Sequence, residues 1–83
     1  MYYVYLLKSL KTGEAYIGFT TDLKMRFAQH NAGKEISTKN KRPWKMFYYE
    51  AYVDKKFALK REKNLKHYGK ALGMLKSRIG FNG

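Results

Sequence analysis

One stretch decides the fold of this chain, Tyr2–Asn31, and it reads YYVYLLKSLKTGEAYIGFTTDLKMRFAQHN. Its opening residues, Tyr2–Leu7, are aromatic, β-branched or large and apolar, which is the composition of a strand buried on both faces or nearly so. Gly13 supplies a turn after this strand, because glycine adopts a positive φ at little cost. The apolar residues of segment 15–19 then predict a second strand, paired with the first as a hairpin.

A helix is expected directly after the hairpin. Thr21 and Asp22 each carry a side-chain oxygen that accepts from the free N–H groups of a first helical turn, so the sequence predicts a helix over Leu23–Asn31. Arg26 and His30 lie four residues apart and therefore face the same ligand. Considered singly, each has an ordinary explanation. Arg26 could be a solvated surface residue, and His30 could be a cation near the C-terminal carbonyls of the helix. We expect the corner between hairpin and helix to gather Tyr5, Tyr16, Arg26 and His30.

The segment after this helix, residues 34–42, is polar and has no periodicity. It predicts a mobile surface loop in which Ser37, Thr38 and Asn40 are available to phosphate oxygens; a solvated connector is the alternative. The loop also carries the cations that we expect to bind nucleic acid: Lys34, Lys39, Lys41 and Arg42.

The second half of the chain predicts one strand and two helices. The aromatic-rich segment 44–53 is expected to be a third strand with its side chains in the core, although a base-stacking platform is an alternative. Simple alternation would place Trp44, Met46 and Tyr48 on one face of that strand. Asp54 caps a helix over residues 55–68, and a short last helix follows over 71–79. The expected fold is α+β, a three-stranded, mainly antiparallel sheet flanked by helices in the order β-β-α-β-α-α.

Glu62 is one of the few acids in an otherwise basic helix, about 40° from Ala58 around the helix axis at about 100° per residue. From the residues alone it has two explanations. It could be an i,i+4 partner of Lys66, which is worth a few tenths of a kcal/mol. It could also be a ligand of a hard cation such as Mg²⁺, which commonly takes one or two protein carboxylates.

Size and composition limit the possibilities further. The 83 residues, with 45% apolar residues, suffice for one domain, 1–83, and are too few for two independent cores. There is no cysteine, which excludes disulfides and fits a reducing compartment. No apolar run approaches the roughly 20 residues of a membrane span. The opening apolar run is too short for a signal peptide and lacks a basic start, so we expect a cytoplasmic protein.

Charge is the strongest compositional signal. Eighteen Lys and Arg residues against six Asp and Glu give a formal net charge of +12, spread along the chain. Such a field attracts polyanions and accelerates their encounter, so we expect nucleic acid as a partner. Incidental affinity of a soluble basic protein is the alternative. An anionic membrane surface is disfavoured because no helix combines a wide apolar face with an unbroken basic one.

Most familiar catalytic sites lack their residues here. There is no cysteine, and neither histidine has a carboxylate nearby in the sequence, so a nucleophilic triad is poorly supported. Two histidines without cysteine do not make a tetrahedral zinc site, and there is no Walker loop. Metal-assisted phosphodiester hydrolysis remains, which requires a base for water, a cation for the developing phosphate charge and a metal ion.

Several ordered motifs resemble the GIY-YIG nuclease superfamily over nearly the whole chain. Tyr3-Val4-Tyr5 is followed after ten residues by Tyr16-Ile17-Gly18, like the paired triplets of that family. The first triplet has tyrosine where glycine is usual, a substitution common in small stand-alone members. Thr21–Arg26, His30 and Ala58-Leu59-x-x-Glu62 are also similar to the family pattern and stand in the right order.

The resemblance implies a metal-dependent endonuclease with a single Mg²⁺ or Mn²⁺. We expect DNA more than RNA as its substrate, although the sequence does not decide between them. By the same resemblance, Tyr5 acts as the general base or orients water, and Tyr16 holds a phosphate oxygen or shares the proton network. Arg26 stabilises the pentavalent phosphate, His30 hydrogen-bonds to Tyr5 or relays its proton, and Glu62 binds the metal.

A tyrosine titrates near pH 10, so about 3 units must be offset before it is a useful base at neutrality. We expect the cationic surroundings, Arg26 and a metal ion to act in that direction. Two alternatives stay open: a nucleic-acid-binding module with the nuclease fold and little or no turnover, and a basic protein that binds structured RNA.

Overall fold

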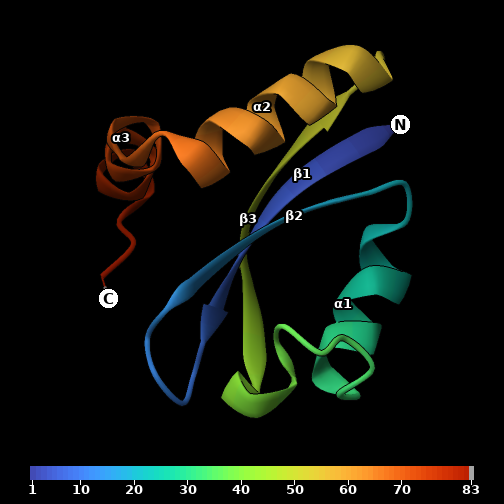
Figure 1. The fold of residues 1–83 in the computed structure, drawn as a ribbon, viewed down its shortest axis with the longest axis vertical. Coiled ribbons are helices and arrows are strands. Elements are labelled where there is room, and N and C mark those ends of the chain that lie inside the picture. Colours follow the sequence, from blue (N-terminus) through green and yellow to red (C-terminus); the bar gives the residue numbers. More distant parts are fainter. Residues whose placement is uncertain (83) are drawn as a thin grey trace.

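A computed structural model describes residues 1–82 and contains three strands and three α-helices in the expected order (Figure 1). The elements are β1 (Tyr2–Ser9), β2 (Ala15–Thr20), α1 (Leu23–Asn31), a 3-10 turn (Lys39–Lys41), β3 (Trp44–Tyr52), α2 (Lys55–His67) and α3 (Gly69–Ile79). The three strands form an antiparallel sheet, so the predicted α+β fold is confirmed.

The sheet has the order β2-β1-β3, with β1 in the centre. This position agrees with the composition of β1, because a central strand with helices on both faces buries nearly every side chain. Gly13 closes the β1–β2 turn with a φ of 79°, the left-handed conformation that the sequence predicted for it.

Two hydrophobic clusters lie on the two faces of β1, since successive side chains of a strand point to opposite faces. Val4 and Leu6 belong to the larger cluster, which also contains the buried residues Ile17, Ala58, Leu65, Leu75 and Phe81. Tyr5 and Leu7 belong to the smaller cluster, which is completed by Trp44, Tyr16, Leu23, Phe27 and Met46. Figure 1 shows the corresponding layers, with α2 and α3 on one side of the twisted sheet and α1 on the other.

A β-bulge changes the pattern of the third strand. The register between β1 and β3 shifts between Leu6 and Leu7, so that Leu6 pairs with Tyr48 and Leu7 with Met46. Phe47, the extra residue, and Tyr48 both pack against the larger cluster. The prediction that Tyr48 shares a face with Trp44 and Met46 was therefore wrong, because one inserted residue reverses the alternation beyond it.

The helices begin where the sequence predicted caps. The Asp22 side chain accepts from the N–H of Met25 at 3.1 Å, and Asp54 accepts from the N–H of Lys56 at 2.9 Å. The last helix begins at Gly69, two residues earlier than expected. None of the helices in residues 1–82 is both long and apolar enough to cross a bilayer.

Candidate active site

Tyr5 lies at the centre of the sheet and is only 2% exposed. It pairs across the β1–β2 ladder with Gly18, and the phenol ring occupies the space above that residue. A Cβ at position 18 would lie 2.3 Å from both Cζ and Oη of Tyr5. Position 18 therefore requires glycine, because the phenol of Tyr5 fills the space that a side chain would occupy.

His30 lies beside this phenol, on α1, and is completely buried. Leu23 and Phe27 anchor α1 to the sheet, and His30 follows Phe27 by three residues on the neighbouring face. Its Nε2 lies 2.7 Å from the Tyr5 Oη, and its Nδ1 lies 2.8 Å from the hydroxyl of Thr38. Both ring nitrogens are therefore engaged inside the protein.

Tyr16 lies next to the same imidazole. Its ring centroid is 5.1 Å from that of His30 and 6.5 Å from that of Tyr5. The ammonium of Lys66 also stands 5.8 Å from the Tyr16 ring centroid. Tyr16 thus links the Tyr5–His30 pair of the sheet and α1 to the side chains of α2.

Arg26 lies one turn before His30 and retains access to solvent, with 30% of its side chain exposed. Its Nη2 donates to Glu35 at 2.6 Å and its Nη1 donates to Gln29 at 3.1 Å. The Glu35 carboxylate raises the pKa of the Arg26 guanidinium, and the guanidinium lowers the pKa of Glu35. The guanidinium has five N–H groups, so some of them remain for a ligand besides those that bind Glu35 and Gln29 and the one directed at Tyr5.

Glu62 lies on α2, and its side chain is 20% exposed. It forms an ion pair with Lys66 at 3.2 Å, the i,i+4 contact expected from the sequence. Its negative charge is also one of the factors that raise the pKa of Tyr5, so the carboxylate lies within electrostatic range of the phenol. The Lys66 ammonium contacts both the Glu62 carboxylate and the Tyr16 ring, so this ion pair of α2 lies next to Tyr16, which belongs to the edge strand β2.

Burial dominates the protonation of Tyr5 and His30. It raises the pKa of Tyr5 to about 12, although Arg26 acts in the opposite direction. The sequence correctly predicted the sign of the Arg26 effect but not that desolvation would exceed it. Burial also lowers the pKa of His30, and the Arg26 charge lowers it further. Phenol and imidazole are both neutral at pH 7.

The loop after α1 contributes two residues that sequence reasoning did not assign to the site, Glu35 and Thr38. Glu35 holds Arg26, and Thr38 contacts His30. Thr38 is completely buried, and its carbonyl accepts from the indole N–H of Trp44 at 2.8 Å. The expectation that Thr38 is available to phosphate was therefore wrong. The one signal in the sequence was an acid and a hydroxyl placed just after a helix that carries Arg26 and His30.

The four cations expected to bind nucleic acid differ in their surroundings. Lys34, Lys39 and Arg42 are exposed. Lys41 instead pairs with Glu14 at 3.0 Å. A polar hollow of about 500 Å³ is lined by Lys11, Asn31, Lys39, Asn40, Arg42 and Pro43. Two of the four predicted cations therefore share one surface with Lys11, which the sequence did not single out.

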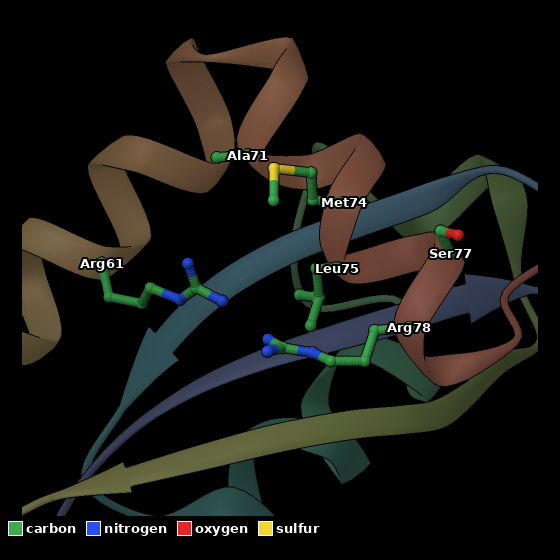
Figure 2. Close-up of a pocket in the computed structure, with 6 residues that line it drawn as sticks. All are labelled: Arg61, Ala71, Met74, Leu75, Ser77 and Arg78. Carbon is green, nitrogen blue, oxygen red and sulfur yellow. The ribbon is translucent and has the colours of Figure 1, made fainter.

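A second hollow, of about 590 Å³, lies on the α2–α3 side and contains none of the residues expected to be catalytic. Figure 2 shows Arg61 of α2 and Arg78 of α3 pointing toward the same space. Arg61 is already bound to Glu50, at 2.9 Å from its Nη2. This hollow therefore offers less free positive charge than its two arginines suggest.

The donor set of the site fits one kind of metal ion. Within residues 1–82 no group of three His, Cys, Asp or Glu side chains could hold a metal by itself. A partly exposed carboxylate, Glu62, fits a hard cation that keeps its waters and takes its remaining ligands from substrate phosphate. It does not fit a metal that needs several nitrogen or sulfur ligands.

The fold and this cluster define a class of protein. Residues 1–75 match the family model of the GIY-YIG catalytic domain, and the chain belongs to this family, which is one of nucleases. Nucleic acid is therefore the implied substrate, and nucleases of this family generally use divalent metals.

Within the family, the chain is similar to small single-domain members that carry the name UPF0213 protein. It is 39% identical over 70 residues to one from Staphylococcus haemolyticus, covering 83% of this chain and 84% of the relative. It is 43% identical over 67 residues to one from Lacticaseibacillus paracasei, covering 80% and 74% respectively. A relative from Lactiplantibacillus plantarum is 40% identical over 73 residues, covering 84% and 71%.

Proposed function

We propose that this protein is a divalent-metal-dependent endonuclease that hydrolyses phosphodiester bonds in DNA. The observation that carries the proposal is the arrangement around Tyr5. A buried phenol is hydrogen-bonded to a neutral imidazole, a partly exposed guanidinium lies beside it, and a carboxylate acts on it electrostatically. These are the base, the cation and the metal ligand that phosphodiester hydrolysis requires.

In the proposed mechanism, Tyr5 moves a proton without first becoming a phenolate. Its oxygen accepts a proton from the attacking water while its own proton passes to Nε2 of His30, 2.7 Å away. The water oxygen forms its bond to phosphorus, the bond to the leaving oxygen breaks, and solvent protonates that oxygen. A pKa of about 12 is compatible with this role, because the phenol remains neutral before and after the transfer.

Arg26 and Glu62 would act on the phosphate. The remaining N–H groups of Arg26 would donate to the equatorial oxygens as negative charge develops there. Tyr16 would hold a phosphate oxygen or share the proton network, since its ring borders both His30 and Lys66. A Mg²⁺ or Mn²⁺ ion held by Glu62 would add positive charge at the same phosphate.

The exposed cations of the loop would hold the substrate backbone. Lys39 and Arg42 line the same hollow as Lys11, and Lys34 is exposed on the same loop. Lys41 is proposed as a phosphate contact only where substrate displaces Glu14. Contacts of this kind make binding strongly dependent on salt.

Cleavage of a panel of linear and branched DNA with Mg²⁺ tests the proposal. Wild-type protein should cleave, whereas Glu62→Gln should lose at least about 100-fold in kcat because the metal ligand is lost. The matched control is Asp54→Asn, which removes an exposed carboxylate, retains the side-chain oxygen that caps α2, and should cleave like the wild type.

Binding is measured on the same panel by fluorescence anisotropy in Ca²⁺. Glu62→Gln should bind DNA about as well as the wild type and weaken steeply with salt. Wild-type binding without cleavage on every substrate would refute the nuclease proposal and support a nucleic-acid-binding module. Equal cleavage by wild type and Glu62→Gln would show that the metal ligand is misassigned.

A further inference from the structure

We infer that Thr38 is a positioning residue that fixes the tautomer of His30, so that Nε2 is free to accept the proton of Tyr5. Thr38 and His30 are both completely buried, and the Thr38 hydroxyl lies 2.8 Å from Nδ1. The effect on catalysis rests on the proposed nuclease function, whereas the assignment of the His30 tautomer does not depend on it.

Glu35, Thr38, His30 and Tyr5 are joined in a series of hydrogen bonds, and the groups at its two ends determine the direction of each bond. At one end, the carbonyl of Glu35 lies 3.5 Å from the Thr38 hydroxyl, and a carbonyl can only accept. The hydroxyl thus has an acceptor for its own proton, which allows it to offer a lone pair to a protonated Nδ1. At the other end, the Arg26 guanidinium beside Tyr5 can only donate, so the phenol proton points away from it, toward Nε2.

The opposite arrangement leaves a buried proton without an acceptor. If Nε2 carried the proton, it would donate to the Tyr5 oxygen, and the phenol O–H would need another acceptor. Among residues 1–82 the phenol oxygen has no hydrogen-bond acceptor besides His30, because Arg26 can only donate. A buried hydroxyl without a partner costs about 1–3 kcal/mol, so this tautomer is disfavoured.

Thr38 is held firmly enough to impose this choice. Its N–H donates to the carbonyl of Glu35 at 3.2 Å, and its own carbonyl accepts from the indole of Trp44 at 2.8 Å. Trp44 is itself fixed to the end of α1, since its N–H donates to the side chain of Asn31 at 2.6 Å. The hydroxyl therefore occupies a defined position beside the ring. The loop contributes to the site by orienting its imidazole.

The test compares Thr38→Val, which is nearly isosteric but lacks the hydroxyl, with Thr38→Ser, which retains it. Nitrogen-15 NMR of histidine-labelled protein at pH 8 reads the tautomer directly, and His67→Gln in every sample leaves one imidazole to assign. Wild type and Thr38→Ser should show protonated Nδ1 and unprotonated Nε2. Thr38→Val should shift the signal toward protonated Nε2.

Cleavage kinetics provide the second measurement. Thr38→Val should lower kcat by about 10–100-fold, the usual effect of removing a group that orients a functional histidine. KM should stay nearly constant, and Thr38→Ser should recover most of the rate. The control is Thr12→Val, which removes an exposed hydroxyl that accepts from the N–H of Glu14 and should cleave like the wild type.

Protonated Nε2 in the wild-type protein would overturn the inference, and so would an unchanged tautomer in folded Thr38→Val. The wild-type and Thr38→Ser spectra decide the question even where Thr38→Val does not fold. If the spectra are as expected but the wild type cleaves no substrate, the proposed nuclease function fails while the tautomer assignment stands.

Discussion

Tyr5 and Tyr52 lie on opposite faces of the same sheet, and burial is the main cause that raises the pKa of each phenol to about 12. Their hydrogen-bond acceptors differ. Tyr52 donates to the carboxylate of Glu50, which also accepts from Tyr48 at 2.8 Å and from Arg61 at 2.9 Å. Tyr5 lies against the neutral imidazole of His30.

This difference separates a structural network from one that can move a proton. Burial raises the pKa of Glu50, but the bonds from Arg61, Tyr52 and Tyr48 together hold it below its usual value. That carboxylate is therefore a poor proton acceptor. A neutral imidazole with a free lone pair accepts a proton much more readily. A raised tyrosine pKa is thus not by itself a sign of catalysis, because the acceptor determines whether the proton can move.

The largest expected effect on cleavage comes from removing a phenol oxygen, that of Tyr5 on one face of the sheet, with Tyr52 on the other face as the comparison. Tyr5→Phe should lower kcat by about 10²–10⁴, the usual contribution of a group that transfers a proton. Tyr52→Phe should leave kcat nearly unchanged and lower the free energy of unfolding by about 1 kcal/mol, for one lost hydrogen bond. Single-turnover cleavage and urea unfolding measure the two quantities. Equal losses of kcat in the two variants would remove the distinction between the faces.

The next effect tests the packing of Tyr5. Gly18→Ala places a Cβ where the phenol now lies, 2.3 Å from its Oη, and should cost about 1–3 kcal/mol of stability through overpacking. Cleavage should fall as well, because the ring must move away from His30.

The matched control is Gly73→Ala, in the exposed middle of α3, where a Cβ would meet no atom within 4 Å. Alanine should stabilise the protein there by up to about 1 kcal/mol, as usual for glycine in a helix. Similar stability of Gly18→Ala and the wild type would mean that the phenol does not occupy the position described.

The sequence predicted most of the fold because its strongest signals are local. An apolar run, glycine turns and two aspartate caps placed β1, β2, α1 and the start of α2 to within a residue or two. The bulge in β3 was not predictable from alternation, since alternation assumes that each residue has one partner across the ladder. The first residue affected, Tyr48, was consequently assigned to the wrong face.

The contacts around the candidate site were only partly predictable. Spacing on α1 predicted that Arg26 and His30 act together, but their partners in the following loop depend on how that loop folds back. The Glu50 network was also missed, although Tyr48, Glu50 and Tyr52 are spaced two apart, the spacing of residues on one face of a strand. This spacing is present in the sequence and predicts that the two tyrosines and the glutamate interact on one face of the strand.

The smallest effects concern the pH dependence of the free energy of unfolding. The two faces of the sheet should lose stability in different pH ranges. The pKa of His30 lies below its usual 6.5, so on acidification the unfolded chain takes up this proton first. The free energy of unfolding should therefore fall as the pH drops below about 6.5, until the folded pKa is reached. The pKa of Glu50 lies below its usual 4.5, so its contribution is complete above that pH and is lost as the pH falls through the folded pKa.

Thermal unfolding from pH 8 to pH 3 measures both ranges. His30→Gln should flatten the first decline and keep the second, while Glu50→Gln should keep the first and reduce the second, to which Glu14 and Glu35 also contribute. His67→Gln, at the exposed end of α2, should follow the wild type in both. Retention of the first decline in His30→Gln would mean that another group titrates there, and the neutral imidazole assigned to the Tyr5 face would lose its support. Because the two declines begin about two pH units apart, measurements between pH 6.5 and pH 4.5 weaken the His30 face while the Glu50 contribution is still complete.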